Sequence, residues 1–274
     1  MNDEQRYIPA EIRREVRRRC GFGCIICGMP VYEYHHIIDW AIVKEHTKEN
    51  ITLLCPNHHA NVTAKLISQQ QVEQFNRNPK NIGAGKSGVL PIYYEGAECT
   101  VTMGTNFFTS RLNNDIDFLC PLMVDGVPLI KFTLQDGHIL LDLLICDSSN
   151  TKLLEVQENA LIYYLPVWDA HFTANTLTIR DKEKKYGLSV TFKPPSIVKI
   201  NSGLIFFNGI KIDISKHKFV LTGDNNTIVD FGGNKTFGLH FGIQVGPKSE
   251  KFTESGLIHI VDLPRFYYDP NNEI

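Results

Sequence analysis

The chain has 274 residues, a formal net charge of −2 and a sequence pI near 6.5. Its composition, 43% hydrophobic and 21% charged, is that of a globular protein and excludes a wholly disordered, collagen-like or coiled-coil chain. The apolar runs are shorter than a membrane span, and the N-terminus is charged where a signal peptide needs apolar residues. We therefore expect a cytoplasmic protein with no membrane segment.

The charge is distributed unevenly along the chain. Residues 1–88 contain 12 Lys and Arg against 9 Asp and Glu, a balance of +3, and residues 89–274 contain the other 16 against 21, a balance of −5. A basic stretch after Pro9 has the pattern of a helix, and like charges spaced i,i+4 on it repel one another. A polyanion would relieve this repulsion. The pattern therefore predicts that four arginines contact phosphate: Arg13, Arg14, Arg17 and Arg18. The alternative is that they form a solvated helix face.

Further elements follow in the order strand, strand, helix. The first predicted strand, Val31–Ile38, is rich in β-branched and aromatic residues, and a loop over residues 39–49 separates it from a second strand, Ile51–Leu54. A helical pattern extends from about Asn57 to Asn76. We expect these elements to form a small N-terminal domain.

The residue composition and the hydrophobic pattern of the sequence change after the first 80 residues. Residues 81–88 are rich in glycine and serine and predict a linker. From residue 89 the chain consists of short β-prone runs separated by turn residues, which predicts a mainly-β domain of sandwich or barrel type. The expected fold class is α+β, with domains at residues 1–80 and 89–274. The second domain is expected to serve recognition, regulation or oligomerisation.

Cysteine and histidine gather in one short window. Four of the seven cysteines and five of the ten histidines lie there: Cys20, Cys24, Cys27, Cys55, His35, His36, His46, His58 and His59. Two knuckle-spaced pairs, Cys24-x2-Cys27 and Cys55-x2-His58, predict a tetrahedral structural zinc site. The alternative is two unrelated reduced cysteine pairs beside a surface histidine. The single cysteines in strand-like runs are expected to be buried free thiols: Cys99, Cys120 and Cys146.

Residues 20–65 resemble the HNH endonucleases of the ββα-metal fold, in the zinc-knuckle subgroup. Three blocks carry the resemblance: Cys24-Ile-Ile-Cys27, then His35-His36-Ile-Ile, then Asn50-Ile-Thr-Leu-Leu-Cys55-Pro-Asn-His58-His59. The family usually has four cysteine ligands, whereas His58 takes the last place here. The resemblance implies phosphodiester hydrolysis with DNA as the substrate.

The resemblance also assigns roles to residues. It implies that His36 is the general base and that Asn50 fixes the loop facing His36. It also implies that His35 and His59 hold one divalent cation, for which Mg²⁺, Mn²⁺, Ni²⁺ and Zn²⁺ are the candidates. An exchange of roles between His58 and His59 is the alternative. Adjacent residues on a regular strand face opposite sides, so His35 and His36 can share a site only where the strand ends or twists.

The expected function is a metal-dependent DNA endonuclease, with restriction or defence against foreign DNA as its context and a homodimer as a possible assembly. One rival is a non-catalytic zinc-knuckle module that binds DNA or protein, and another is a nuclease gated by a ligand of the β domain. Outside this pattern, His46 is interpreted as a solvated loop histidine, and Asp169 with His171 as a strand-edge pair.

Overall fold

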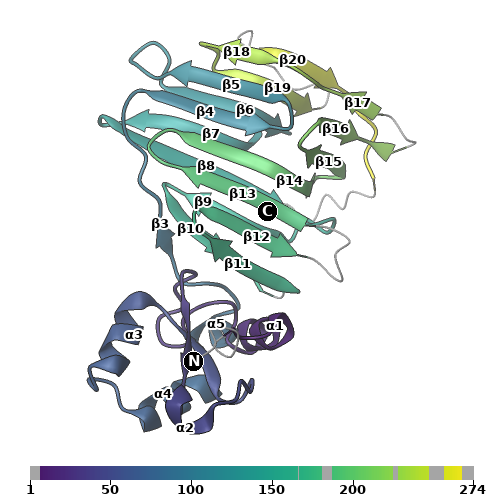
Figure 1. The fold of residues 1–274 in the computed structure, drawn as a ribbon. Coiled ribbons are helices and arrows are strands. Elements are labelled where there is room, and N and C mark those ends of the chain that lie inside the picture. The colour runs from purple at the N-terminus through teal and green to yellow at the C-terminus, as the bar shows by residue number, and fades with distance from the viewer. Residues whose placement is uncertain (1–6, 166, 181–186, 225–227, 247–255, 267–274) are drawn as a thin grey trace. The chain divides into compact units, whose positions relative to one another are not determined.

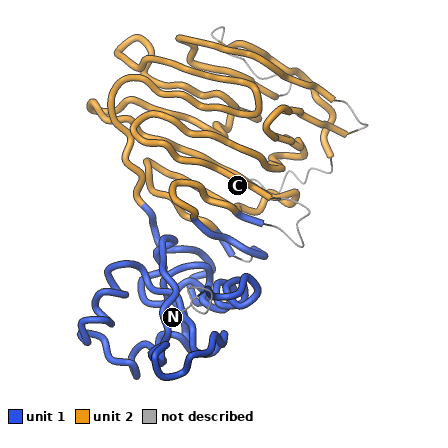
Figure 2. Tube along the Cα trace, viewed as in Figure 1, with its two compact units in different colours: residues 1–90, 164–172, 179–183 blue, residues 91–163, 173–178, 184–274 orange. Residues whose placement is uncertain are grey.

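The computed structural model describes residues 7–165, 167–180, 187–224, 228–246 and 256–266. The chain divides into two compact units, shown in Figure 2. Unit 1 comprises residues 1–90, 164–172 and 179–183, and unit 2 comprises residues 91–163, 173–178 and 184–274. Within the part of the chain that is described, no helix has the length and apolar character needed to cross a membrane.

The main part of unit 1 is a two-stranded sheet surrounded by short helices (Figure 1). Its elements are α1 (Ala10–Arg19), β1 (Glu33–His36), α2 (Trp40–Val43), β2 (Ile51–Leu54), α3 (Pro56–Thr63), α4 (Gln69–Arg77) and α5 (Lys80–Ala84). Strands β1 and β2 are antiparallel, with Glu33 opposite Leu54 and His36 opposite Ile51. The expected strand, strand, helix order is confirmed.

The core of unit 1 is built on β2, whose four residues are all buried. Val16 of α1 and Val72 of α4 belong to the same apolar cluster, together with Cys24 and Cys55. Helix α1 therefore packs Val16 against this core and exposes Glu11, Glu15 and Arg18. This arrangement places the end of β1 and the start of α3 on a common framework.

The helical pattern over residues 57–76 forms two helices rather than one. Lys65 adopts a left-handed conformation with φ of 60°, which ends the first helical segment. Ser68 then starts α4 with a reciprocal cap: its hydroxyl accepts from the amide of Gln71 at 3.3 Å, and its own amide donates to the Gln71 side chain at 2.9 Å. The capping box, which the periodicity alone did not indicate, divides the segment.

The expected linker over residues 81–88 instead packs against the cysteine knuckle. Asn81 is buried, and its amide donates to the carbonyls of Gly21 at 2.9 Å and Gly28 at 3.1 Å. The amide of Gly88 donates to the Gly28 carbonyl at 2.9 Å. Gly28 has φ of +81°, and a Cβ there would lie 2.2 Å from the Asn81 side-chain oxygen. The glycines permit close backbone packing, so the segment belongs to the folded unit.

The remainder of the chain is rich in strands (Figure 1). They are β3 (Leu90–Pro91), β4 (Glu98–Met103), β5 (Asn106–Arg111), β6 (Phe118–Val124), β7 (Val127–Gln135), β8 (His138–Cys146), β9 (Lys152–Gln157), β10 (Ala160–Tyr163), β11 (Asp169–Thr173), β12 (Thr176–Arg180), β13 (Gly187–Lys193), β14 (Ile197–Phe207), β15 (Ile210–Ser215), β16 (Lys218–Thr222), β17 (Ile228–Asp230), β18 (Lys235–Phe237), β19 (Phe241–Gly246) and β20 (Gly256–Val261). The mainly-β expectation for this part is confirmed.

Strand β14 connects two sheets of unit 2. Its first half pairs with β13 and, in parallel, with β4, while its second half pairs with β15 and meets β8 at Phe206 and Cys146. Burial alternates along strands such as β15, as expected where one face packs on a core. The three cysteines of this unit are buried free thiols as predicted, and burial raises the pKa of each to about 12: Cys99, Cys120 and Cys146.

Candidate active site and metal centre

The two knuckle-spaced pairs converge on one point. The ligand atoms of Cys24, Cys27, Cys55 and His58 all lie within 4.8 Å of one another. Nδ1 of His58 is 3.4 Å from Sγ of Cys24 and 3.2 Å from Sγ of Cys55. Cys55 directly follows β2 and precedes α3, and His58 lies in the first turn of α3, so one strand-to-helix junction supplies two of these residues. A backbone turn, in which the Gly28 amide donates to the Cys24 carbonyl at 2.8 Å, supplies the other two.

The donor set of this cluster fits zinc. Three sulfurs and one imidazole nitrogen match the tetrahedral coordination of structural Zn²⁺. A hydrogen bond from Cys27 lowers the pKa of Cys24, which favours the thiolate form of that sulfur. Cys20 stays outside the cluster as a buried free thiol, 3.6 Å from the Thr52 hydroxyl. Among the described residues, the group of side chains that could hold a metal ion is the one predicted from the spacing of Cys24, Cys27, Cys55 and His58.

The histidines expected to act in catalysis line one cleft. Strand β1 ends at His36, so the alternation that would separate His35 from His36 stops at this point. Both histidines and His59 of α3 line a cavity of about 750 Å³, which Lys65 and Gln69 also border. The strand end that a shared site requires is therefore present.

His35 and His59 lie next to each other in the cleft. Their ring centroids are 5.1 Å apart, with the rings edge to face. Burial, followed by the charges of His59 and His36, lowers the pKa of His35 to about 4, so its ring is neutral near pH 7. Nδ1 of His59 is 2.7 Å from Oε2 of Glu33. Glu33 was not foreseen from the sequence, although its place two residues before His35 puts it on the same face of β1.

His36 contacts a histidine that sequence reasoning assigned to solvent. Nε2 of His36 is 3.1 Å from Nδ1 of His46, and the His46 ring stacks on Trp40 with centroids 4.2 Å apart. Burial, together with the charge of His46, lowers the pKa of His36. The expectation of a solvated His46 is therefore wrong, because the 39–49 loop folds back over the end of β1. The presence of Trp40 in the same loop as His46 was the sequence feature that could have indicated this packing.

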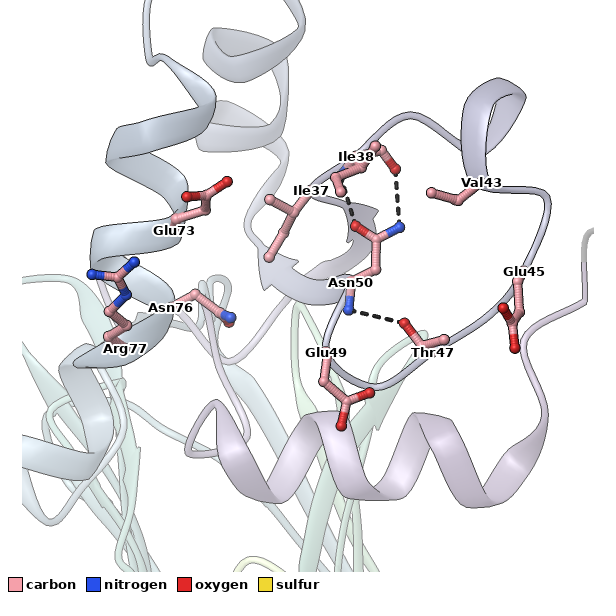
Figure 3. Close-up of a pocket in the computed structure, with 10 residues that line it drawn as sticks. All are labelled: Ile37, Ile38, Val43, Glu45, Thr47, Glu49, Asn50, Glu73, Asn76 and Arg77. Atoms are coloured by element: carbon pink, nitrogen blue, oxygen red, sulfur yellow. Dashed lines mark hydrogen bonds between the residues drawn. The ribbon is translucent and has the colours of Figure 1, made fainter.

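Asn50 holds the backbone at Ile37 and Ile38, the two residues that follow His36, and Figure 3 shows its two side-chain bonds to Ile38. Its side-chain oxygen accepts from the Ile38 amide at 2.7 Å, and its side-chain nitrogen donates to the Ile38 carbonyl at 3.0 Å. The Asn50 carbonyl also accepts from the Ile37 amide at 2.8 Å. These bonds close the loop between the two strands and fix the direction in which the chain leaves His36.

A second cavity of about 470 Å³ lies around Asn50 (Figure 3). Glu45, Glu49 and Glu73 line it with a single arginine, Arg77. Three carboxylates against one guanidinium give this cavity a negative character that disfavours phosphate. The histidine cleft, whose lining includes Asp39 and Lys65, lacks this excess of carboxylates.

The arginines of α1 differ in availability. Arg17 is largely buried within unit 1, where its guanidinium donates to both carboxylate oxygens of Asp169 at 2.7 and 2.6 Å and to the Tyr34 hydroxyl at 2.9 Å. Burial by itself would lower the pKa of Arg17, but the hydrogen bonds and charge of Asp169 raise it above its usual value. The expectation that Arg17 contacts phosphate is corrected: its donors are occupied by an internal ion pair.

The neighbouring arginines are less constrained. The Arg14 guanidinium lies 4.9 Å from the centroid of the Trp168 ring, and Arg13 donates to the Tyr7 hydroxyl. Arg18 is exposed to solvent. Asp169 is 3.9 Å from His171, too far for a hydrogen bond, so the expected strand-edge pair is replaced by the pairing with Arg17.

Comparison with known proteins supports the interpretation of this region. No curated protein and no solved structure matches the chain. A family model does match, and the matched segment contains the cysteine and histidine cluster, the cleft histidines and Asn50. Residues 24–65 match the model of the HNH endonuclease family.

Proposed function

We propose that unit 1 is a metal-dependent endonuclease domain that hydrolyses DNA phosphodiester bonds. The observation that carries this proposal is the cleft lined jointly by His35, His36 and His59, inside the segment that matches the HNH endonuclease model. A non-catalytic knuckle would need only its metal ligands and would have no reason to gather three further histidines around an open cavity.

In this proposal His36 is the general base. It takes a proton from the water that attacks the scissile phosphorus. Because burial and His46 lower its pKa, the ring is neutral near pH 7 and has a lone pair available. Asn50 contributes by holding the backbone at Ile38, which restricts the movement of the chain that carries His36.

His35 and His59 are the residues that would hold a divalent cation. Their rings lie close together in a half-buried site, and Glu33 can fix the orientation of His59 by accepting from its Nδ1. When bound, the cation would act as a Lewis acid on the phosphate and stabilise the departing 3′ oxygen. Imidazole donors suit Mn²⁺, Ni²⁺ and Zn²⁺ at least as well as Mg²⁺.

Zn²⁺ at the cluster of Cys24, Cys27, Cys55 and His58 has a structural role in this proposal. The ligands come from the knuckle and the β2–α3 junction, so metal binding would tie the knuckle to the helix that carries His59 into the cleft. Arg18 and Lys65 are exposed basic residues that can contact phosphates flanking the cleft.

Plasmid cleavage tests the catalytic assignment. Supercoiled DNA is incubated with the full chain and Mg²⁺, Mn²⁺, Ni²⁺ or Zn²⁺, and wild type is compared with His36→Ala. Loss of the general base should lower the cleavage rate by about 100-fold or more, with zinc content and circular dichroism unchanged. His138→Ala, at an exposed position in unit 2, is the control and should cleave at the wild-type rate. Full activity of His36→Ala would refute the assignment.

We further propose that unit 2 selects the target and that the context is defence against foreign DNA, with a homodimer as the form that cuts both strands. Expression in a bacterial host should then reduce phage plating, and His36→Ala should abolish the protection. A purified protein that cuts host and phage DNA equally and gives no protection would contradict the defence role while leaving the nuclease intact.

A further inference from the structure

Beside two residues that line the cleft, His36 and Trp40, lies an aromatic group that the proposed mechanism does not use. His46 lies between Trp40, on which it stacks at 4.2 Å with ring planes 20° apart, and His36, to which its Nδ1 is hydrogen-bonded at 3.1 Å. We propose that His46 is a positioning residue that fixes which ring nitrogen of His36 carries the proton. This inference rests on the proposed function, in which His36 is the base.

The tautomer follows from the hydrogen bond. A neutral histidine carries its proton on one ring nitrogen and has a lone pair on the other. Since Nε2 of His36 is bonded to His46, the nitrogen that can face water is Nδ1. His36 must therefore hold its own proton on Nε2 and donate it to Nδ1 of His46. The opposite direction would put the proton on Nδ1 of His36 and leave no lone pair for water.

The same bond assists the proton transfer itself. When His36 accepts the proton from water, an O–H bond breaks, an N–H bond forms at Nδ1, and the oxygen electrons attack phosphorus as the 3′ oxygen leaves. The ring of His36 becomes positively charged, and its Nε2–H then makes a charged hydrogen bond to His46, which is stronger than a neutral one. His46 thus plays the orienting part that a carboxylate plays beside the histidine of a catalytic triad.

Local structure holds His46 in this position. Asp39 caps α2 by accepting from the Ala41 amide at 2.8 Å, and Lys44, with φ of 49°, turns the chain back toward the cleft. Nε2 of His46 is buried and has no hydrogen-bond partner among the described residues. Leaving a polar atom buried in this way is unfavourable for folding, so stability does not explain why a histidine occupies the position.

Nuclear magnetic resonance can determine the tautomer of His36 independently of any activity measurement. The full chain, with ¹⁵N-labelled histidine and loaded zinc, is studied by long-range ¹H–¹⁵N correlation near neutral pH. Wild-type His36 should show a protonated Nε2 and an unprotonated Nδ1. His46→Phe keeps a ring for Trp40 but removes the acceptor, so the two tautomers of His36 should become mixed. His46→Asn restores an acceptor at the Nδ1 position and should restore the bias.

Cleavage kinetics provide the second measurement. His46→Phe should lower kcat by about 10- to 100-fold, the usual cost of losing a group that orients a functional histidine, with KM within about twofold of wild type. His46→Asn should recover most of that loss. His138→Phe, at an exposed site in unit 2, controls for the introduced ring and should change neither quantity.

The outcomes separate this inference from the nuclease proposal. A wild-type His36 protonated on Nδ1, or a His46→Phe variant with wild-type tautomer and kcat, would overturn the role of His46. A wild-type protein that cleaves no DNA, but whose His36 tautomer still depends on His46, would refute the nuclease and support the hydrogen bond. If His46→Phe fails to fold, His46→Asn and His46→Gln decide the question, because only the Asn amide reaches the position of Nδ1.

Discussion

The two units of this protein use cysteine in opposite ways. In unit 2, Cys99, Cys120 and Cys146 are buried among apolar strand residues, and burial raises the pKa of each, so they behave as small hydrophobic side chains. In unit 1, Cys24 and Cys55 are core residues and also belong to the cluster that could hold a metal ion. In the proposal above, Zn²⁺ at this cluster stabilises the small unit, whereas alternating strand residues form the core of the large unit.

Removal of the metal should give the largest difference in stability between the two units. We expect Cys24→Ser, or a strong chelator, to unfold unit 1 while unit 2 stays folded, because a structural zinc ion contributes about 10 kcal/mol or more to folding. Hydrogen exchange of the full chain, read with zinc content, measures both units together. Cys146→Ser is the matched control: it should cost stability in unit 2 and leave zinc bound. Full amide protection of β2 in zinc-free Cys24→Ser would contradict the prediction.

The second comparison concerns the buried carboxylate of Asp169 in unit 1, which is paired with Arg17. Arg17→Met should destabilise unit 1 by about 3–5 kcal/mol, because Asp169 would remain buried with no cation beside it. Chemical denaturation of the full chain measures this loss. Adding Asp169→Leu to Arg17→Met should recover most of the stability, since no unpaired charge is then left.

Arg18 is the natural counterpart of Arg17 on the same helix. Arg18→Ala should leave the unfolding transition within about 0.5 kcal/mol of wild type, because the side chain is exposed. It should instead weaken DNA binding and reduce the dependence of affinity on salt by about one counterion. Equal destabilisation by Arg17→Met and Arg18→Ala would show that the ion pair with Asp169 is not what holds this helix.

A smaller effect distinguishes the two proposed metal sites of unit 1. Glu33→Gln should weaken binding of Mn²⁺ at the histidine cleft by about 10-fold, which is about 1.4 kcal/mol, because His59 loses the carboxylate on its Nδ1. Calorimetry on zinc-loaded protein measures this change, and zinc content should stay constant. Glu49→Gln, from the acidic cavity, is the control. Unchanged Mn²⁺ affinity would separate Glu33 from the metal site.

Local patterns in the sequence predicted the cysteine and histidine cluster of unit 1. Ligands two residues apart in a tight turn must approach one another, so the spacing of Cys24 with Cys27 and of Cys55 with His58 was sufficient to foresee the cluster that the structure contains. The strand, strand, helix order and the mainly-β remainder were also predictable, because periodicity and turn residues report local conformation. The division of residues 57–76 was not, since it depends on a cap and a left-handed residue.

The sequence was enough to predict the two pairs of knuckle-spaced residues, the class of each unit and the three buried thiols of unit 2, because each depends on neighbours within a few residues. Only the tertiary structure decided the partners of Arg17, His36 and His59, which are Asp169, His46 and Glu33. Arg17 and Asp169 are far apart along the chain, and His46 reaches His36 through a loop without periodic signal. Such pairings depend on how the chain returns to itself, which no local pattern records.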